Sequence, residues 1–229
     1  MALFLAAPGT VHGGAQVYQP LSASVRASLN KSVADHSVPY LAFSTESEAR
    51  QWLAAMSKRL AKRVLDRLER EEFLVTVHYE AKRAGLDPQL VLGLIQVESN
   101  FRKYAVSRAG ARGFMQVMPF WVPLIGRRDD NLFHLRTNLR YGCVILRHYL
   151  DMENGDLYRA LGRYNGSLGK PGYPTQVVRA WQRDWHYSTR TASSRQGLPQ
   201  LAYRAAEGHG GNYGLPLFPA LRPVAGRLQ

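Results

Sequence analysis

Apolar residues recur at helical spacing along most of this 229-residue chain, and sustained strand-type alternation is absent. The longest such stripe is formed by Ala49, Trp52, Leu53, Met56, Leu60, Val64 and Leu68. Charged residues between these positions fall on the opposite side, which faces water. Thr45 and Glu48 fit a capping box just before the stripe. The pattern predicts one long amphipathic helix that begins at Thr45.

Similar spacing predicts several further helices. They are expected at 73–83, 89–98, from about 114 to Pro119, 141–150, 156–163 and 175–185. Gly85 suits the end of the first of these helices, and Pro119 stops or kinks the third. Residues 17–43 show no clear period and are expected to wrap over the surface. The predicted fold class is therefore mainly α, with little or no sheet.

Glu98 is an acidic residue in a helix that is otherwise apolar. Asp87 and Pro88 suit the start of this helix, and Leu94 and Val91 precede Glu98 by one and two turns on the same side. Burial disfavours a charged carboxylate, so the pKa of Glu98 is expected to rise. Such a group can act as a general acid. A solvated residue or a salt-bridge partner is the alternative interpretation.

Composition limits the possible functions. Apolar residues make up 45% of the chain, but no apolar run is long enough for a transmembrane span. The net charge of +13 favours polyanionic partners, either nucleic acid or a bacterial cell wall. The basic residues are spread along the sequence without a nucleic-acid-reading motif, so no nucleic acid is expected.

Cysteine and histidine usage predicts neither a disulfide nor a metal site. Cys143 is the single cysteine and lies in an apolar helical stretch, where it is expected to be a buried core residue. A second cysteine or a histidine pair at ligand spacing is missing. We therefore expect no metal and no cofactor.

Four sequence blocks that begin at Glu98 resemble the signature of soluble lytic transglycosylases, the SLT family, whose catalytic domain is similar to goose-type lysozyme. The blocks are Glu-Ser-Asn-Phe at 98–101, Ala-Val-Ser-Arg-Ala-Gly-Ala-Arg-Gly-Phe-Met-Gln-Val-Met-Pro at 105–119, Asp-Asn-Leu at 130–132 with Asn-Leu-Arg-Tyr-Gly at 138–142, and Arg-Tyr-Asn-Gly at 163–166. Their order and gaps are family-like, and the resemblance covers roughly residues 73–185. Phe114 departs from the usual Leu, and Arg163 from a small residue.

The resemblance implies a lysozyme-like helical fold and peptidoglycan cleavage by one acid that serves twice. Glu98 would protonate the β-1,4 bond between N-acetylmuramic acid (MurNAc) and N-acetylglucosamine (GlcNAc). The acetamido group of the substrate would stabilise the cation, and Glu98 would then accept the proton of the 6-hydroxyl, which gives a 1,6-anhydro-MurNAc end. No second acid lies between Glu98 and Asp129, which agrees with this scheme. Asp129 and Asp130 are expected to form a loop and a helix cap.

The same resemblance assigns substrate-binding positions. Ser107 and Gln116 would make polar contacts, and Met118 would form an apolar wall. Tyr164 would lie close to Glu98 and orient it or the acetamido group. Asn165 would hold its loop or contact a sugar.

Supporting roles follow from the motif as well. Ser99 would tie the helix end through its hydroxyl, and Phe101 would pack under the acid. Gly113 would permit tight backbone near the ligand. Trp121 and Tyr173 are candidates for stacking on sugars, with ordinary burial as the alternative.

Two other functions remain open from the residues. A lysozyme-type muramidase would hydrolyse the same bond, and a non-enzymatic basic protein would only bind a polyanion. A wall-cleaving enzyme would be exported to the periplasm or the cell envelope. A cell-envelope protein partner could bind through the N-terminal extension or the C-terminal tail.

The expected organisation has four parts. Residues 1–15 are a possible signal remnant, and 16–72 form an N-terminal extension with the amphipathic helix. Residues 73–187 form the lytic transglycosylase catalytic domain. Residues 188–229, rich in Gly, Pro, Ser and Arg, form a flexible tail.

Overall fold

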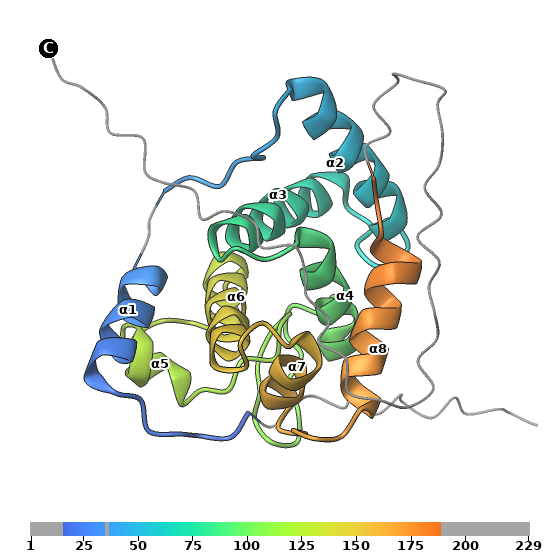
Figure 1. Ribbon diagram of the computed structural model, residues 1–229. Helices are drawn as coiled ribbons and strands as arrows, with labels where there is room; N and C mark the ends of the chain where they lie inside the picture. Colours follow the sequence, from blue (N-terminus) through green and yellow to red (C-terminus); the bar gives the residue numbers. More distant parts are fainter. Residues whose placement is uncertain (1–15, 35–36, 189–229) are drawn as a thin grey trace, which may run out of the picture. The chain divides into compact units, whose positions relative to one another are not determined.

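The computed structural model describes residues 16–34 and 37–188, and these residues are mainly helical (Figure 1). The helices are α1 Ala23–Val33, α2 Glu46–Leu60, α3 Arg67–Arg83, α4 Pro88–Ser99, α5 Trp121–Ile125, α6 Leu135–Met152, α7 Leu157–Asn165 and α8 Gly172–Ala180, followed by a π-helical turn at Trp181–Trp185. Within these ranges, β-structure is limited to two isolated antiparallel bridges in the loop between α4 and α5. The predicted mainly α fold class with little or no sheet is confirmed.

Parts of the predicted organisation fall outside the described residues. The possible signal remnant at 1–15 is one of them, and the predicted tail at 188–229 is another except for its first residue. Helix α3 runs through the predicted boundary between 72 and 73. The four-part division stays a prediction.

Helix α6 lies near the centre of the described helices, with α1 and α5 on one side and α4 and α8 on the other (Figure 1). Helix α4 packs against α3, α8 and the π-helical turn. Its Gly93 permits close approach, because a Cβ there would come within 2.8 Å of the Trp181 backbone nitrogen. The apolar side chains Leu92, Leu94 and Ile95 are fully buried in the core. A carboxylate carried by this helix is therefore placed in apolar surroundings.

Three predicted helix boundaries are confirmed, namely the starts at Thr45 and Asp87 and the end at Gly85. The Thr45 hydroxyl accepts a hydrogen bond from the Glu48 amide at 3.2 Å, and the Asp87 carboxylate accepts one from the Gln89 amide at 2.7 Å. Gly85 follows α3 with φ of +68°, which favours glycine. No described helix has both the length and the apolar character that a membrane span requires.

The prediction of one long helix from Thr45 through Leu68 was wrong. Helix α2 ends at Leu60, and a new helix begins after Asp66, whose carboxylate accepts a hydrogen bond from the Glu69 amide. The Arg70 guanidinium donates to the Val64 carbonyl at 2.7 Å and so braces the turn. Leu68 is 77% exposed, because the break rotates it away from the core.

Residues 17–43 contain helix α1, which the sequence did not predict. Leu29 and Val33 are its two buried residues, so its apolar stripe is too short to give a clear period. The Ser22 hydroxyl accepts a hydrogen bond from the Val25 amide and caps the helix. The Asn30 amide donates to the Ile125 carbonyl at 3.2 Å and joins α1 to α5.

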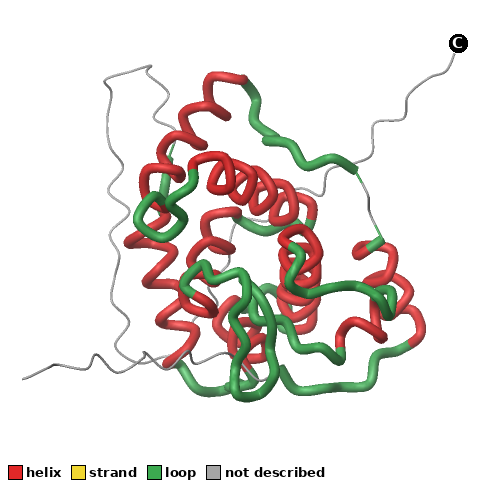
Figure 2. Tube along the Cα trace, turned by 180° about the vertical axis from the view of Figure 1, so that it is seen from behind, coloured by secondary structure: helices red, strands yellow, loops and turns green. Residues whose placement is uncertain are grey.

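The helix predicted from about Phe114 to Pro119 is instead a loop (Figure 2). Gly113 and Gln116 have φ values of +75° and +49°, which a right-handed helix does not permit. The Asn138 side chain accepts a hydrogen bond from the Met115 amide and donates to the Leu132 carbonyl, at 2.8 Å each. These contacts come from α6, so the local apolar pattern gave no sign of them.

Candidate active site

Glu98 lies in the last turn of α4 and is 0% exposed. The helix ends directly after it, because Asn100 and Phe101 adopt left-handed φ values of +49° and +63°. The predicted burial of Glu98 is confirmed. Its carboxylate is thus presented at a helix end, next to a loop rather than in the middle of a packed helix face.

Tyr173, from the first turn of α8, donates its hydroxyl to Glu98 Oε1 at 2.5 Å. Burial, the charge of Glu98 and this hydrogen bond together raise the pKa of Tyr173 well above its ordinary value. The phenol therefore stays protonated and acts as a neutral donor to the carboxylate. Sequence reasoning offered sugar stacking or burial for Tyr173 and missed this contact, which only the packing of α8 on α4 creates.

Tyr164, from α7, is fully buried, and the charge of Glu98 adds to burial in raising its pKa. Its hydroxyl donates to the Met115 carbonyl at 2.7 Å. A phenol has one proton to donate, so Tyr164 holds the Met115 loop rather than donating to Glu98. The charge of Glu98 acts on Tyr164, and the carboxylate accepts a phenol hydrogen bond from Tyr173. The role predicted for Tyr164 stays a prediction.

Ser99 and Phe101 fix the end of α4. The Ser99 hydroxyl lies 2.7 Å from the Phe114 carbonyl and 3.3 Å from the Ile95 carbonyl, so it ties the helix end to the following loop. The Phe101 ring lies 5.9 Å from the Phe73 ring and 5.3 Å from the Trp185 ring. This aromatic cluster anchors the turn that follows Glu98.

Two predicted substrate-binding residues make hydrogen bonds within the loop. The Ser107 hydroxyl accepts from the Ala111 amide at 3.0 Å. The side-chain amide nitrogen of Gln116 donates to the carbonyls of Ala105 and Gly113 at 3.1 and 2.9 Å. Gln116 is 0% exposed, and its Oε1 atom is buried without a hydrogen-bond partner. These side chains shape the loop, and one buried acceptor is left over.

Gly113 and Asn165 have local structural contacts. A Cβ on Gly113 would lie 2.6 Å from the Leu132 carbonyl oxygen, so glycine is required by the approach of the chain to α6. The Asn165 amide donates to the Ser167 hydroxyl at 3.1 Å and holds the loop after α7. Trp121, the other stacking candidate, is 3% exposed and is a core residue.

Comparison with known proteins finds a known domain in this part of the chain. Residues 76–178 match the Transglycosylase SLT domain. The chain contains an SLT domain. The resemblance seen in the sequence is thereby confirmed, and Glu98, Tyr164 and Tyr173 all lie within the matched residues.

This chain spans less than half the length of two curated relatives that it matches. The membrane-bound lytic murein transglycosylase C of Mannheimia succiniciproducens is 46% identical over 149 residues, which is 58% of this chain and 40% of the relative. A transglycosylase of Enterobacteria phage PRD1 is 33% identical over 111 residues, or 45% of this chain and 41% of the relative. An inactive mutant of the lytic transglycosylase Slt from Pseudomonas aeruginosa matches at 26% identity, covering 57% of this chain and 22% of that one, with a TM-score of 0.36.

One buried contact with the SLT domain comes from outside residues 76–178. Gln16 is 3% exposed, its amide nitrogen donates to the Gln116 carbonyl at 3.2 Å, and its Oε1 accepts from the Met118 amide at 3.1 Å. The side chain also interacts with the Tyr164 hydroxyl. Sequence reasoning placed Gln16 in the extension and gave it no role, because nothing in the local sequence links it to the loop.

Asp129 and Asp130 form a loop of the SLT domain, as predicted, but they do not cap a helix. Asp130 accepts hydrogen bonds from the Tyr141 hydroxyl and the Arg127 amide, and Asp129 pairs with the Arg127 side chain. The residue that precedes α6 is His134. Among the described residues, no group of three or more His, Cys, Asp and Glu side chains is placed to hold a metal ion.

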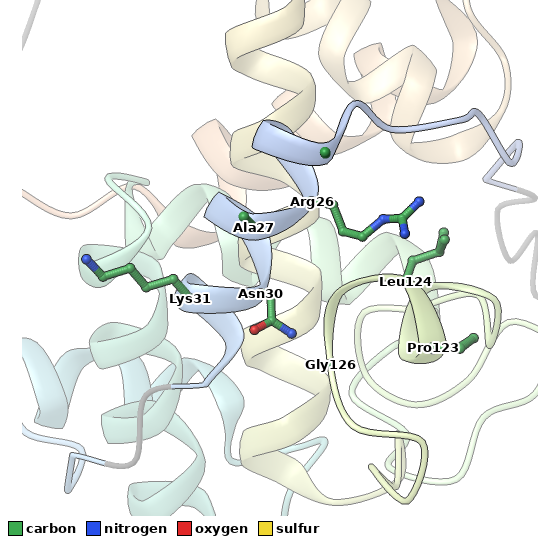
Figure 3. Close-up of a pocket in the computed structure, with 8 residues that line it drawn as sticks. Arg26, Ala27, Asn30, Lys31, Pro123, Leu124 and Gly126 are labelled. Carbon is green, nitrogen blue, oxygen red and sulfur yellow. The ribbon is translucent and has the colours of Figure 1, made fainter.

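The described cavities do not include Glu98. A cavity of about 550 Å³ lies between α1 and α5, lined among others by Arg26, Lys31 and Leu124 (Figure 3). Arg26 and Lys31 extend in opposite directions from α1, so their charges do not converge on one point (Figure 3). A second cavity, of about 370 Å³, lies beside Asp130 and Leu132. The Glu98 side chain, at 0% exposure, has no contact with solvent in this state.

Proposed function

We propose that this SLT domain is a peptidoglycan lytic transglycosylase. It would cleave the β-1,4 bond between MurNAc and GlcNAc without water and leave a 1,6-anhydro-MurNAc end. The observation that carries the proposal is the buried Glu98 carboxyl at the end of α4, which receives a hydrogen bond from the Tyr173 phenol. The name of the Mannheimia relative, a lytic murein transglycosylase, supports this substrate class.

The reaction needs one group that first gives and then takes a proton. Glu98 in its acid form donates a proton to the glycosidic oxygen, and the C1–O bond breaks while the acetamido oxygen of the substrate stabilises C1. The resulting carboxylate takes the proton of the MurNAc 6-hydroxyl, whose oxygen bonds to C1. Glu98 is thereby returned to its acid form, and water does not enter the balance.

Tyr173 would support both halves of this cycle. Its hydrogen bond to Glu98 Oε1 stabilises the carboxylate that forms after the first proton transfer. The raised pKa of Tyr173 keeps the phenol from delivering its own proton. Glu98 can therefore exchange protons with the sugar while its orientation is held.

The loop between α4 and α5 would form the glycan-binding wall. Ser107 and Gln116 would contribute mainly by setting the shape of this loop, since their hydrogen bonds run within it. Met118 is partly exposed and would contact the sugar directly, and Asn165 would hold the neighbouring loop after α7. Tyr164 would fix the loop through the Met115 carbonyl.

The site of action would be the cell envelope, and more specifically the periplasm. The net charge of +13 favours an anionic polymer such as the wall, and the Mannheimia relative is named as membrane-bound. An envelope protein that binds outside the SLT domain, through the extension or the tail, would be a partner of this enzyme.

Mass spectrometry of products released from purified peptidoglycan tests the proposal. Muropeptides that end in anhydro-MurNAc, lighter by one water than the hydrolytic species, are the expected result. Reducing-end products would retain Glu98 as the acid but make the chain a muramidase. If binding occurs without any released product, the chain is a polyanion-binding protein and the proposal fails.

A further inference from the structure

Residues 16–21 cross the loop that forms the candidate glycan-binding wall. In Figure 1 the chain before α1 runs along one edge of the molecule toward the loop that follows α4, and Figure 2 shows the same approach from behind. Gln16 makes two hydrogen bonds to the loop, to the Gln116 carbonyl and from the Met118 amide. These residues, which we name the N-terminal strap, lie outside the SLT domain.

The Gln16 carboxamide has the same hydrogen-bonding groups as an N-acetyl group. Each has a carbonyl oxygen that accepts hydrogen bonds and, bonded to the same carbonyl carbon, a nitrogen with at least one N–H donor. The loop offers the complementary pair, the Gln116 carbonyl as acceptor and the Met118 amide as donor, at 3.2 and 3.1 Å. An acetamido group of the glycan would compete with Gln16 for these two atoms.

Few contacts hold the rest of the strap in place. Residues 17 to 20 are all exposed, and Tyr18 is 54% exposed. The Tyr18 ring meets Phe120 edge to face at a centroid distance of 5.8 Å. Leu21, at the end of the strap, packs partly buried against the core and stays as its anchor. Residues 16–20 can therefore leave the loop without breaking the core.

The site cannot work in the state described, because a glycan strand must touch the acid. Glu98, Tyr164 and Gln116 are each 0% exposed. Gln16 also interacts with the Tyr164 hydroxyl, and the charge of Glu98 raises the pKa of that hydroxyl. The buried Gln116 Oε1 atom has no hydrogen-bond partner, so closure leaves one acceptor unsatisfied. Displacement of the strap would uncover this corner of the site.

We propose that the N-terminal strap is an autoinhibitory element, in which Gln16 occupies the place of a glycan N-acetyl group until substrate displaces it. This inference rests on the proposed function, because it names what the strap competes with. The loop and Tyr164 belong to the SLT domain, whereas the strap does not, so inhibition can be removed without altering the acid.

The first test compares Gln16→Ala with Gln19→Ala in the full chain. Gln19 is an exposed residue of the same type in the same segment, which makes it the matched control. Loss of two hydrogen bonds at Gln16 is expected to raise the rate of muropeptide release by about tenfold at limiting peptidoglycan. Gln19→Ala is expected to release product at the wild-type rate. A Gln16→Ala rate at or below wild type would overturn the proposal.

A second variant guards against a merely structural effect at Gln16. Tyr18→Ala removes the ring contact with Phe120 but leaves the carboxamide intact. It is expected to raise the release rate as well, by a smaller factor than Gln16→Ala. Circular dichroism and thermal unfolding establish that both variants are folded. A slower Tyr18→Ala enzyme of normal stability would mean that the strap builds the site instead of blocking it.

Binding separates failure of the strap from failure of the proposed function. In the Glu98→Gln background, sedimentation with insoluble peptidoglycan measures the Kd without cleavage. Adding Gln16→Ala is expected to lower this Kd by about tenfold. An unchanged Kd overturns the strap. A lowered Kd combined with no product from any variant that retains Glu98 keeps the strap and removes the enzymatic function.

Discussion

Glu80 and Glu98 are both fully buried glutamates of the SLT domain, and they differ in their donors. Glu80, on α3, forms an ion pair through Oε2 with Arg83 at 2.9 Å. Its Oε1 atom forms ion pairs with Arg136 and Arg140 at 3.1 and 3.4 Å. Glu98, on α4, receives the neutral Tyr173 hydroxyl at 2.5 Å. Burial of a carboxylate therefore does not by itself identify a catalytic acid.

The cluster around Glu80 has a structural task. Arg83 also donates to the Ser32 carbonyl and Arg140 donates to the Val33 carbonyl, so the same guanidinium groups dock the end of α1 onto α3 and α6. Three guanidinium groups pair with the Glu80 carboxylate. Glu98 instead receives a hydrogen bond from a neutral phenol, as the proposed proton exchange at Glu98 requires. Changes at Glu80 are therefore expected to affect stability, and changes at Glu98 are expected to affect activity.

The largest effect on stability is expected from Glu80→Ala. Removal of this charge leaves three partly buried cations facing one another, so the free energy of unfolding is expected to fall by about 3–5 kcal/mol. Urea denaturation measures this loss. Glu46→Ala, which breaks an exposed pair with Arg50, is the control and is expected to change little. Equal losses for the two variants would remove the structural role of Glu80.

His78 lies two residues before Glu80 on α3 and is expected to make the stability of the fold depend on pH. It is 1% exposed and lies against Phe43 and Trp52, and burial, with a smaller effect of Lys82, lowers its pKa from 6.5 to about 4. The unfolded chain binds this proton more readily, so the stabilising contribution is complete above pH 6.5 and is lost as pH falls toward 4. The gap corresponds to about 3 kcal/mol.

The measurement for His78 is urea unfolding at neutral and acidic pH for wild type and His78→Phe. Carboxylates also titrate in this window, so the quantity of interest is the difference between the two pH dependences. His78→Phe is expected to lose less stability on acidification than wild type. Identical pH dependences would show that His78 accepts a proton in the folded protein.

Tyr173→Phe is expected to weaken activity with little effect on the fold. It removes the hydrogen bond to Glu98 while the ring still fills its place, so the cleavage rate is expected to fall by about ten- to a hundredfold. Tyr158→Phe, at an exposed tyrosine of α7, is the control and is expected to keep the wild-type rate. A Tyr173→Phe enzyme with wild-type activity would mean that the phenol is a packing residue.

The smallest effect on stability is expected from Glu98→Gln. An amide of the same shape still accepts from the Tyr173 hydroxyl, so the free energy of unfolding is expected to change by less than about 1 kcal/mol. Thermal and urea unfolding measure it. A loss as large as that of Glu80→Ala would show that the charge of Glu98 holds the fold together, and the comparison would fail.

The sequence predicts local features of this molecule well and long-range contacts poorly. The caps at Thr45 and Asp87, the helix that ends at Glu98 and its burial follow from neighbouring residues and are confirmed. The apolar pattern at 114–119 wrongly predicts a helix, because the shape of this loop depends on the side chain of Asn138 in α6. The roles proposed for the site residues stay predictions.

The contacts at the candidate site that the sequence does not predict come from distant elements. Tyr173 reaches Glu98 across 75 positions, and Gln16 reaches the Gln116 carbonyl across 100. Neither residue carries a local signal of its partner, because a tyrosine in an apolar helix and a glutamine in an aperiodic segment have many ordinary explanations. The SLT motif indicates Tyr164 as the neighbour of Glu98. In the structure, the packing of α8 on α4 lets the Tyr173 hydroxyl donate a hydrogen bond to Glu98.

The most direct test of this account is the rate of anhydro-muropeptide release by Glu98→Gln, compared with wild type on the same peptidoglycan. Unfolding curves first establish that the variant is folded. If Glu98 is the general acid and base, the rate falls by about 10²–10⁴-fold while binding to peptidoglycan is retained. Release of anhydro products at the wild-type rate would contradict the account, because the proton would then come from another group.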